Sequence, residues 1–140
     1  MNPRDVVSQF GFSLVGKEYL WGGAGPYFDC SGLCIELLKC AGLKPPHDMS
    51  ASQLFEHYKP TSEWGAIQWG SLLFFGQSTA AIKHVSFALN DLQMLEAGGG
   101  DASCKTIEAS RARGAFTKVC WIGNRKDFVA SLLPKYPFPV

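Results

Sequence analysis

The spacing of apolar residues changes once along this chain, near residue 60, and that change limits the folds the chain can adopt. Before residue 60, apolar residues recur with the period of an amphipathic helix. Beyond it, Val85, Phe87 and Leu89 alternate with Ser86 and Ala88, which is the period of a strand. Helices therefore precede antiparallel hairpins without βαβ alternation, and the pattern predicts an α+β fold.

Capping residues predict three helices in the first half of the chain. Asn2-Pro3 is typical of a helix start, because asparagine caps a helix and proline suits its first turn. Ser50 and Gln53 have the spacing of a capping box. With glycines as the expected stops, the helices are predicted at residues 2–16, 29–41 and 50–58.

Strands are predicted in the second half, with one turn that sets their register. Asn90-Asp91 is expected to join strand 85–89 to strand 92–97, so that residue 97 faces residue 84. The other predicted elements are a buried strand at 72–75, weaker strands at 105–109 and 117–122, a short helix after Asn124 that carries 128–133, and a tail at 134–140.

Length and composition describe one compact domain. The chain has 140 residues, which is close to the roughly 150 of one domain, and 46% hydrophobic residues suit a packed core. A net charge of +1 provides no field for binding nucleic acid or an anionic membrane. The longest apolar run, Leu72 to Phe75, is too short to span a bilayer. No signal peptide is visible, so we expect synthesis in the cytoplasm without one.

The chain contains five cysteines, an odd number that favours reduced thiols over a disulfide framework. Cys34, Cys40 and Cys120 are expected to be small buried side chains without a chemical role. No CxxC pair occurs and the histidines are scattered, so neither a metal site nor a cofactor is predicted. A redox switch between Cys30 and Cys34 is a weaker alternative, because residues four apart share one helix face.

Cys30 is the residue for which the sequence suggests chemistry. It follows a loop dense in glycine and aromatic residues, 19–27, and lies at the start of the second predicted helix. Free backbone N–H groups and the dipole at a helix start favour an anion such as a thiolate. The N–H of Cys30 would also point at the oxygen of an attacked carbonyl. Cys30 is therefore a candidate nucleophile; the alternative is an inert buried cysteine.

A cysteine nucleophile needs a base, and His84 is the best placed of three histidines. His47 lies in a proline-containing loop and His57 on a short polar helix, so both are expected at the surface without a role. His84 opens a strand after a loop, where its imidazole can face the helix start. Glu96 lies on the next strand and is a candidate acceptor for the second imidazole N–H, the alternative being a solvent-facing strand glutamate.

Four short blocks follow one another along the chain. They are Gly16-x-x-Tyr19-x-Trp21-Gly22-Gly23, Phe28-Asp29-Cys30-Ser31-Gly32-Leu33, Gly70-Ser71-Leu72-Leu73-Phe74-Phe75 and His84-Val85. In order and spacing these blocks resemble the NlpC-type cysteine peptidases, papain-like enzymes that cut the stem peptides of the bacterial cell wall. The resemblance implies N-terminal helices packed on a central antiparallel sheet, with Cys30 as nucleophile at a helix N-terminus and His84 as base.

The resemblance also implies how a substrate would be held. Asp29 and Ser31 would line the groove, where relatives hold the amino end of a stem peptide, and Tyr19 would stand beside the thiol and help to stabilise the oxyanion. Trp21 is a candidate wall of the groove, although aromatics near a helix start often belong to the core. The implied scissile bond joins D-glutamate to a diamino acid or lysine.

Three positions depart from the family pattern. Glu96 stands where relatives carry His, Asn or Gln, and its charge is expected to raise the pKa of His84. Ser71 replaces the usual aspartate and Ser86 the usual glycine, both away from the expected chemistry.

Two other functions use the same residues. One is a cysteine acyltransferase or amidase acting on another amide or a lipid, and the other is an inactive relative that only binds wall peptide. For the peptidase we expect action at the cell wall, with a phage tail or a secretion system as the partner in delivery; a recycling enzyme is the other context that the sequence leaves open.

Overall fold

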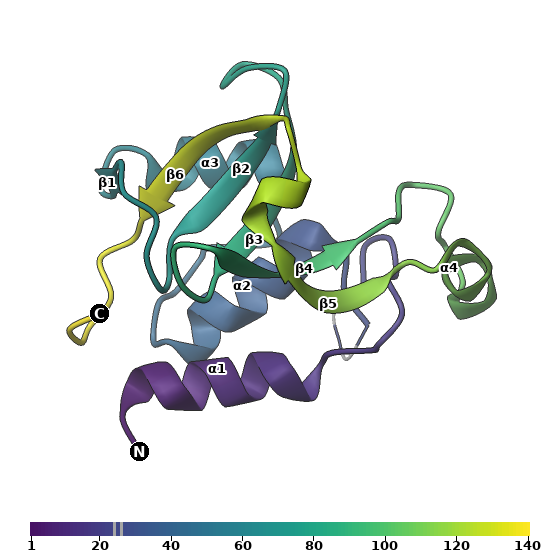
Figure 1. Ribbon diagram of the computed structural model, residues 1–140, viewed down its shortest axis with the longest axis horizontal. Helices are drawn as coiled ribbons and strands as arrows, with labels where there is room; N and C mark the ends of the chain where they lie inside the picture. The colour runs from purple at the N-terminus through teal and green to yellow at the C-terminus, as the bar shows by residue number, and fades with distance from the viewer. Residues whose placement is uncertain (24, 26) are drawn as a thin grey trace.

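The computed structural model describes residues 1–140 except 24 and 26, so the loop predicted at 19–27 lies outside the described residues at these two positions. Three helices come first and a six-stranded antiparallel sheet follows, with a fourth helix inserted between two of its strands, which confirms the α+β prediction (Figure 1). The helices are α1 (Pro3–Ser13), α2 (Cys30–Cys40), α3 (Ala51–Tyr58) and α4 (Ile107–Arg113), with a short 3₁₀ turn η1 (Ile122–Asn124). The strands are β1 (Glu63–Trp64), β2 (Leu72–Gly76), β3 (Ile82–Ala88), β4 (Gln93–Gly98), β5 (Phe116–Trp121) and β6 (Phe128–Leu133), in the spatial order β1-β6-β2-β3-β4-β5.

The first three helices begin at the capping residues that the sequence indicates. The side chain of Asn2 accepts a hydrogen bond of 3.0 Å from the backbone N–H of Asp5. Ser50 and Gln53 form both bonds of a capping box, at 2.9 and 3.2 Å. Each cap satisfies an N–H group that the helix itself leaves unpaired, so these helix starts are fixed locally.

Two expected elements are wrong. The predicted strand at 105–109 is occupied by α4, which Thr106 caps and Gly114 ends in the left-handed conformation, φ 68°. The predicted helix at 128–133 is β6, which lies between β1 and β2. A short apolar run fits either period, and here pairing on both edges of β6 decides for the strand.

The predicted register between β3 and β4 is wrong by one residue. A register with residue 97 opposite residue 84 would pair Phe87 with Met94. In the structure, Phe87 pairs with Leu95 and Ala88 with Met94. Side chains alternate between the two faces of a sheet, so the predicted register would place Glu96 and His84 on opposite faces. The observed register places them on the same face.

The two faces of the sheet carry separate apolar clusters. On one face, Phe74, Val85 and Phe87 belong to the main core, which includes Leu33, Leu37 and Leu38 of α2. On the other, Leu73, Phe75, Ala88, Met94 and Ile122 form a smaller cluster. Helix α2 packs against β3 and β4, and this packing brings its N-terminus to the start of β3.

The C-terminal residues 134–140 pack against the domain. The ring of Tyr136 lies 5.5 Å from that of Trp69, and its hydroxyl donates a hydrogen bond of 2.6 Å to the carbonyl of Gly70. In the described part of the chain, none of the helices combines the length and apolar character needed to cross a bilayer.

Candidate active site

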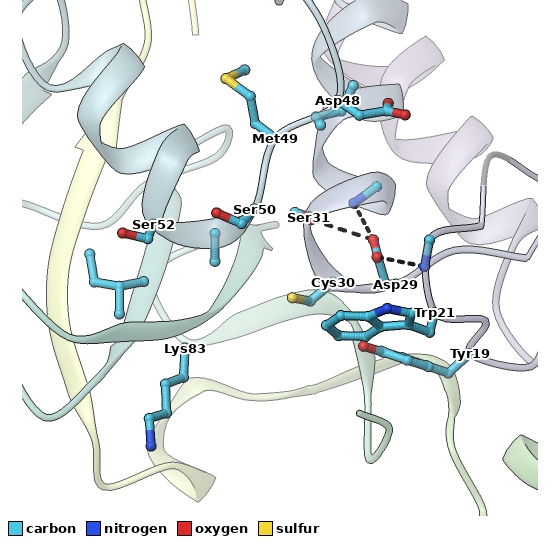
Figure 2. A pocket seen from close by; sticks show the side chains of 15 residues that line it. Tyr19, Trp21, Asp29, Cys30, Ser31, Asp48, Met49, Ser50, Ser52 and Lys83 are labelled. Atoms are coloured by element: carbon cyan, nitrogen blue, oxygen red, sulfur yellow. Dashed lines mark hydrogen bonds between the residues drawn. The ribbon is translucent and has the colours of Figure 1, made fainter. Parts of the chain in front are cut away.

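The start of α2 is fixed by Asp29, the residue before the candidate nucleophile. One carboxylate oxygen of Asp29 accepts a hydrogen bond of 2.8 Å from the N–H of Gly32, which caps the helix. The other accepts one of 3.0 Å from the N–H of Gly22 and so ties the preceding loop to the helix (Figure 2). Ser31 Oγ lies 3.4 Å from the first oxygen. Cys30 is therefore held at the first turn of α2.

Gly32 is required by this close packing. A Cβ at position 32 would lie 2.8 Å from Asp29 Oδ1 and 3.1 Å from the carbonyl oxygen of Gly23. The glycine of the Asp-Cys-Ser-Gly block thus lets the carboxylate and the loop approach the helix backbone.

His84 connects Cys30 to Glu96. Its Nε2 lies 2.7 Å from Glu96 Oε2. Cys30 is close enough to the imidazole to raise its pKa. His84 is 8% exposed and Glu96 6%, so the pair lies almost entirely out of water. The register between β2 and β3 shifts beside His84: Phe75 pairs with His84 but Gly76 with Ile82, so Lys83 is an extra residue on β3. The Phe75 ring lies 5.6 Å from the imidazole.

The surroundings of His84 favour its protonated form. Burial lowers the pKa of His84, but hydrogen bonds and charge from Cys30 and Glu96 raise it more, and the resulting pKa is about 9 against an ordinary 6.5. This agrees with the expectation that the Glu96 carboxylate raises the pKa of His84. An imidazolium beside Cys30 is the partner that a thiolate nucleophile requires.

Glu96 stays ionised although it is buried. Burial raises its pKa. The opposing effects are larger: hydrogen bonding and charge from His84, a hydrogen bond from Cys120 and the charge of Arg125 all lower it, so the net pKa is below the usual value. Cys120 Sγ lies 3.3 Å from Glu96 Oε1, the oxygen that does not face His84. The carboxylate therefore has a partner on each oxygen.

Tyr19 is buried beside Cys30. It is 3% exposed, its backbone N–H donates to the carbonyl of Ala115, and its own carbonyl accepts a bond from Ser110 of α4. Burial raises the pKa of the Tyr19 hydroxyl, and the nearby Cys30 and Asp29 raise it further, so the phenol keeps its proton. Gly100 packs against the ring so closely that any side chain there would collide with it.

A pocket of about 360 Å³ opens over Cys30 (Figure 2). Tyr19 and Trp21 lie side by side at one end, Met49, Ser50 and Ser52 form the opposite wall, and Lys83 lies on a third side. Trp21 is 50% exposed, which places it on the pocket wall and not in the core. The full lining is Tyr19, Trp21, Gly22, Asp29, Cys30, Ser31, Gly32, Ile35, Asp48, Met49, Ser50, Ala51, Ser52, Ile82 and Lys83.

The family follows from a match over most of the chain. The model of the NlpC/P60 family matches residues 16–121, which include every candidate site residue. The chain belongs to the NlpC/P60 family.

Known members resemble this NlpC/P60 chain in sequence and in fold. It is 32% identical over 107 residues to the peptidoglycan endopeptidase RipA of Mycobacterium tuberculosis, over 66% of this chain and 22% of RipA. The NlpC/P60 domain of the peptidoglycan hydrolase SagA superposes with a TM-score of 0.67 at 23% identity, covering 94% of this chain and 98% of that one. RipD of M. tuberculosis, described as a non-catalytic NlpC/P60 domain protein adapted to peptidoglycan binding, gives 0.68 at 23% identity over 95% and 97%. The chain thus spans about a fifth of the length of the curated RipA it matches, and it has the papain-like NlpC/P60 fold.

The structure brings the predicted site residues of this NlpC/P60 domain together. Tyr19, Trp21, Asp29, Cys30 and Ser31 line the pocket, and His84 and Glu96 extend from Cys30 into the protein. The catalytic and binding roles of these seven residues stay predictions. His47 and His57 are exposed, as expected.

Two cysteines are less buried than the sequence predicts. Cys34 is buried as expected, but Cys40 is exposed at the last turn of α2. Cys120 is only half-buried and contacts Glu96. No local motif signals this contact, because it depends on pairing between β4 and β5, where Met94 lies opposite Cys120.

Proposed function

We propose that this protein is a cysteine endopeptidase that hydrolyses an amide bond in peptidoglycan stem peptides, between D-glutamate and a diamino acid. One observation carries the proposal. His84 lies close enough to Cys30, at the N-terminus of α2, for Cys30 to raise its pKa, while its Nε2 lies 2.7 Å from Glu96 Oε2. The proposed nucleophile, its base and the group that orients the base thus lie in a row beside a pocket.

In the proposed reaction, the Cys30 thiolate attacks the amide carbonyl carbon and forms a tetrahedral oxyanion. In this proposal the N–H of Cys30 and the Tyr19 hydroxyl stabilise that oxyanion. The role of Tyr19 is supported by its raised pKa and by its place beside Cys30 in the pocket lining. His84 holds the proton from the thiol and gives it to the leaving amine as the C–N bond breaks. Water, deprotonated by His84, then attacks the thioester and releases the acid and the free thiol.

The pocket supports a peptide with a free amino end as substrate. Asp29 supplies negative charge at the end where Trp21 provides an exposed aromatic face, and Ser31 adds a hydroxyl. A protonated L-alanine amine would be attracted by the Asp29 carboxylate, while the peptide backbone packs along Trp21.

A second candidate is peptidoglycan binding without hydrolysis. The fold likeness to RipD, described as non-catalytic and adapted to peptidoglycan binding, is the observation that favours it. The two candidates differ in what happens to the substrate: a binding domain leaves the stem peptide intact.

The test is digestion of purified peptidoglycan and of a soluble tripeptide stem, with the products weighed by mass spectrometry. The wild type is expected to release fragments cut after D-glutamate, and Cys30→Ala is expected to release none. Equal release by Cys30→Ala would overturn the peptidase. Binding of intact wall by the wild type, with no cleavage under any condition, would favour the second candidate.

We also propose the cell wall as the place of action, reached with a partner such as a phage tail or a secretion system. Peptidoglycan as the substrate supports this proposal, because the polymer lies outside the cytoplasm. Immunodetection of the protein in wall, cytoplasmic and virion fractions tests it: recovery from the cytoplasm alone would contradict it.

A further inference from the structure

The contacts that link His84 to Glu96 extend to one further side chain, that of Cys120. Glu96 Oε2 faces His84, and Oε1 lies 3.3 Å from Cys120 Sγ on β5. The register of β4 and β5 pairs Met94 with Cys120 and Glu96 with Lys118, so that Glu96 and Cys120 point to the same side of the sheet. The thiol therefore reaches the carboxylate from the neighbouring strand.

The Cys120 thiol is a permanent donor. Burial raises its pKa to about 12, with the charge of Glu96 and the hydrogen bond to it acting in the same direction and Lys118 and Arg125 opposing. Cys120 therefore stays protonated over the range in which His84 titrates. A protonated thiol can only donate to an ionised carboxylate, so the direction of this bond is fixed.

Other charged groups near Glu96 are engaged elsewhere. Arg125 lies over the Phe75 ring and forms two bonds to Asp127, at 2.9 and 2.8 Å. Lys118 Nζ lies over the ring of Phe116. Within the described residues, His84 is the one basic side chain within ion-pair distance of Glu96. The groups coupled to the His84–Glu96 pair are thus Cys30 and Cys34 from α2, Cys120 from β5, and Arg125 with Asp127 after η1. Lys118 pairs with Glu96 across β4 and β5.

We propose that Cys120 is a positioning residue: its thiol holds Glu96 Oε1 so that Oε2 stays directed at His84 Nε2. The inference rests on the proposed function of Cys30 and His84. A glutamate carboxylate that is hydrogen-bonded at one oxygen can rotate about its Cγ–Cδ bond. One that is hydrogen-bonded at both oxygens keeps a single orientation. Cys120 thus acts on the reaction through Glu96 and His84 without touching substrate.

The test compares three substitutions at position 120. Cys120→Ser keeps a donor, Cys120→Ala removes it, and Cys120→Val removes it without leaving a cavity. Cys40→Ala, an exposed cysteine at the other end of α2, is the matched control for loss of a thiol. One readout is kcat and KM on a tripeptide stem. The other is the pH dependence of iodoacetamide alkylation, followed by mass spectrometry at Cys30 itself, which needs no peptide substrate.

Cys120→Ala and Cys120→Val are expected to lower kcat about three- to tenfold with little change in KM, as loss of one hydrogen bond implies. Their alkaline transition in Cys30 alkylation is expected at lower pH, because His84 loses a fixed partner. Cys120→Ser and Cys40→Ala are expected to resemble the wild type. An unchanged profile in Cys120→Val, or an equal loss in Cys120→Ser, would overturn the inference. If the wild type cleaves no stem peptide but the alkylation profiles shift as described, the proposed function fails and the positioning role stands.

Discussion

His84 Nε2 and Glu96 Oε2 lie 2.7 Å apart in a part of the protein that is closed to water. Burial alone would disfavour the charge on each residue. Together they keep both charges, because each is the hydrogen-bonding partner that stabilises the charged form of the other. The Glu96 carboxylate that hydrogen-bonds the imidazole therefore also helps to set the pH at which the imidazole loses its proton.

The first prediction concerns the charge of Glu96. Glu96→Gln keeps the shape and an acceptor oxygen but removes the charge, so the pKa of His84 should fall from about 9. The proposed reaction requires a protonated His84 beside the thiolate, so the alkaline limb of kcat/KM is expected to move down by about one pH unit. A pH–rate profile on a soluble stem peptide measures this. An alkaline limb that does not move would show that another group causes it.

A second prediction concerns stability. The pKa of His84 is about 9 in the folded protein and 6.5 ordinarily, so its contribution to stability is fully present below pH 6.5 and is lost as the pH rises to 9. The wild type should therefore lose about 1–3 kcal/mol of unfolding free energy relative to His84→Gln over this interval. Urea unfolding of both proteins at pH 6 and pH 9.5 measures the difference. Parallel changes in the two proteins would contradict the assignment of the titration to His84.

A third prediction tests the space around the carboxylate. A Cβ at Gly98 would lie 2.9 Å from Glu96 Oε1, and the backbone there needs no positive φ, so alanine fits the strand but displaces the carboxylate. Gly98→Ala is expected to lower kcat about tenfold while costing little stability. Gly123→Ala is the matched control, because a Cβ at Gly123 meets nothing within 4 Å. Equal activity in both variants would show that the position of Glu96 does not matter.

The helical half of the fold was predictable because its signals are local. Asn2, Asp29 and Ser50 each cap the helix that follows them, and a cap acts within one turn of its own residue. The strand at 128–133 was mistaken for a helix because its identity depends on pairing with β1 and β2, which lie far away in the sequence.

In the candidate site, too, the features set by neighbouring residues were predictable and those set by strand pairing were not. Cys30 was found from its place at a helix start and in a characteristic block, and both are features of neighbouring residues. That Glu96 shares a face with His84 depends on a register that the turn at Asn90-Asp91 suggested only to within one residue. Cys120 was missed because its contact requires the register of a further strand pair.

The last prediction separates the two effects of Asp29. Its carboxylate caps α2 and also binds the N–H of Gly22, whereas Asn2 caps α1, outside the site. Asp29→Ala and Asn2→Ala should each cost about 0.5–2 kcal/mol of stability, as the loss of a helix cap does. Asp29→Ala alone should reduce activity, because it frees both the start of α2 and the loop that carries Trp21, and it also removes the carboxylate proposed to attract the substrate amine.

Thermal unfolding and kcat/KM on a stem peptide, measured for both variants, check this prediction. Measured well below the unfolding temperature, Asn2→Ala should keep wild-type activity, and Asp29→Ala should lose at least tenfold. If both variants lost activity in proportion to their stability, Asp29 would be a helix cap and nothing more. If neither variant lost activity, Asp29 would not be needed to place the Cys30 thiol beside His84.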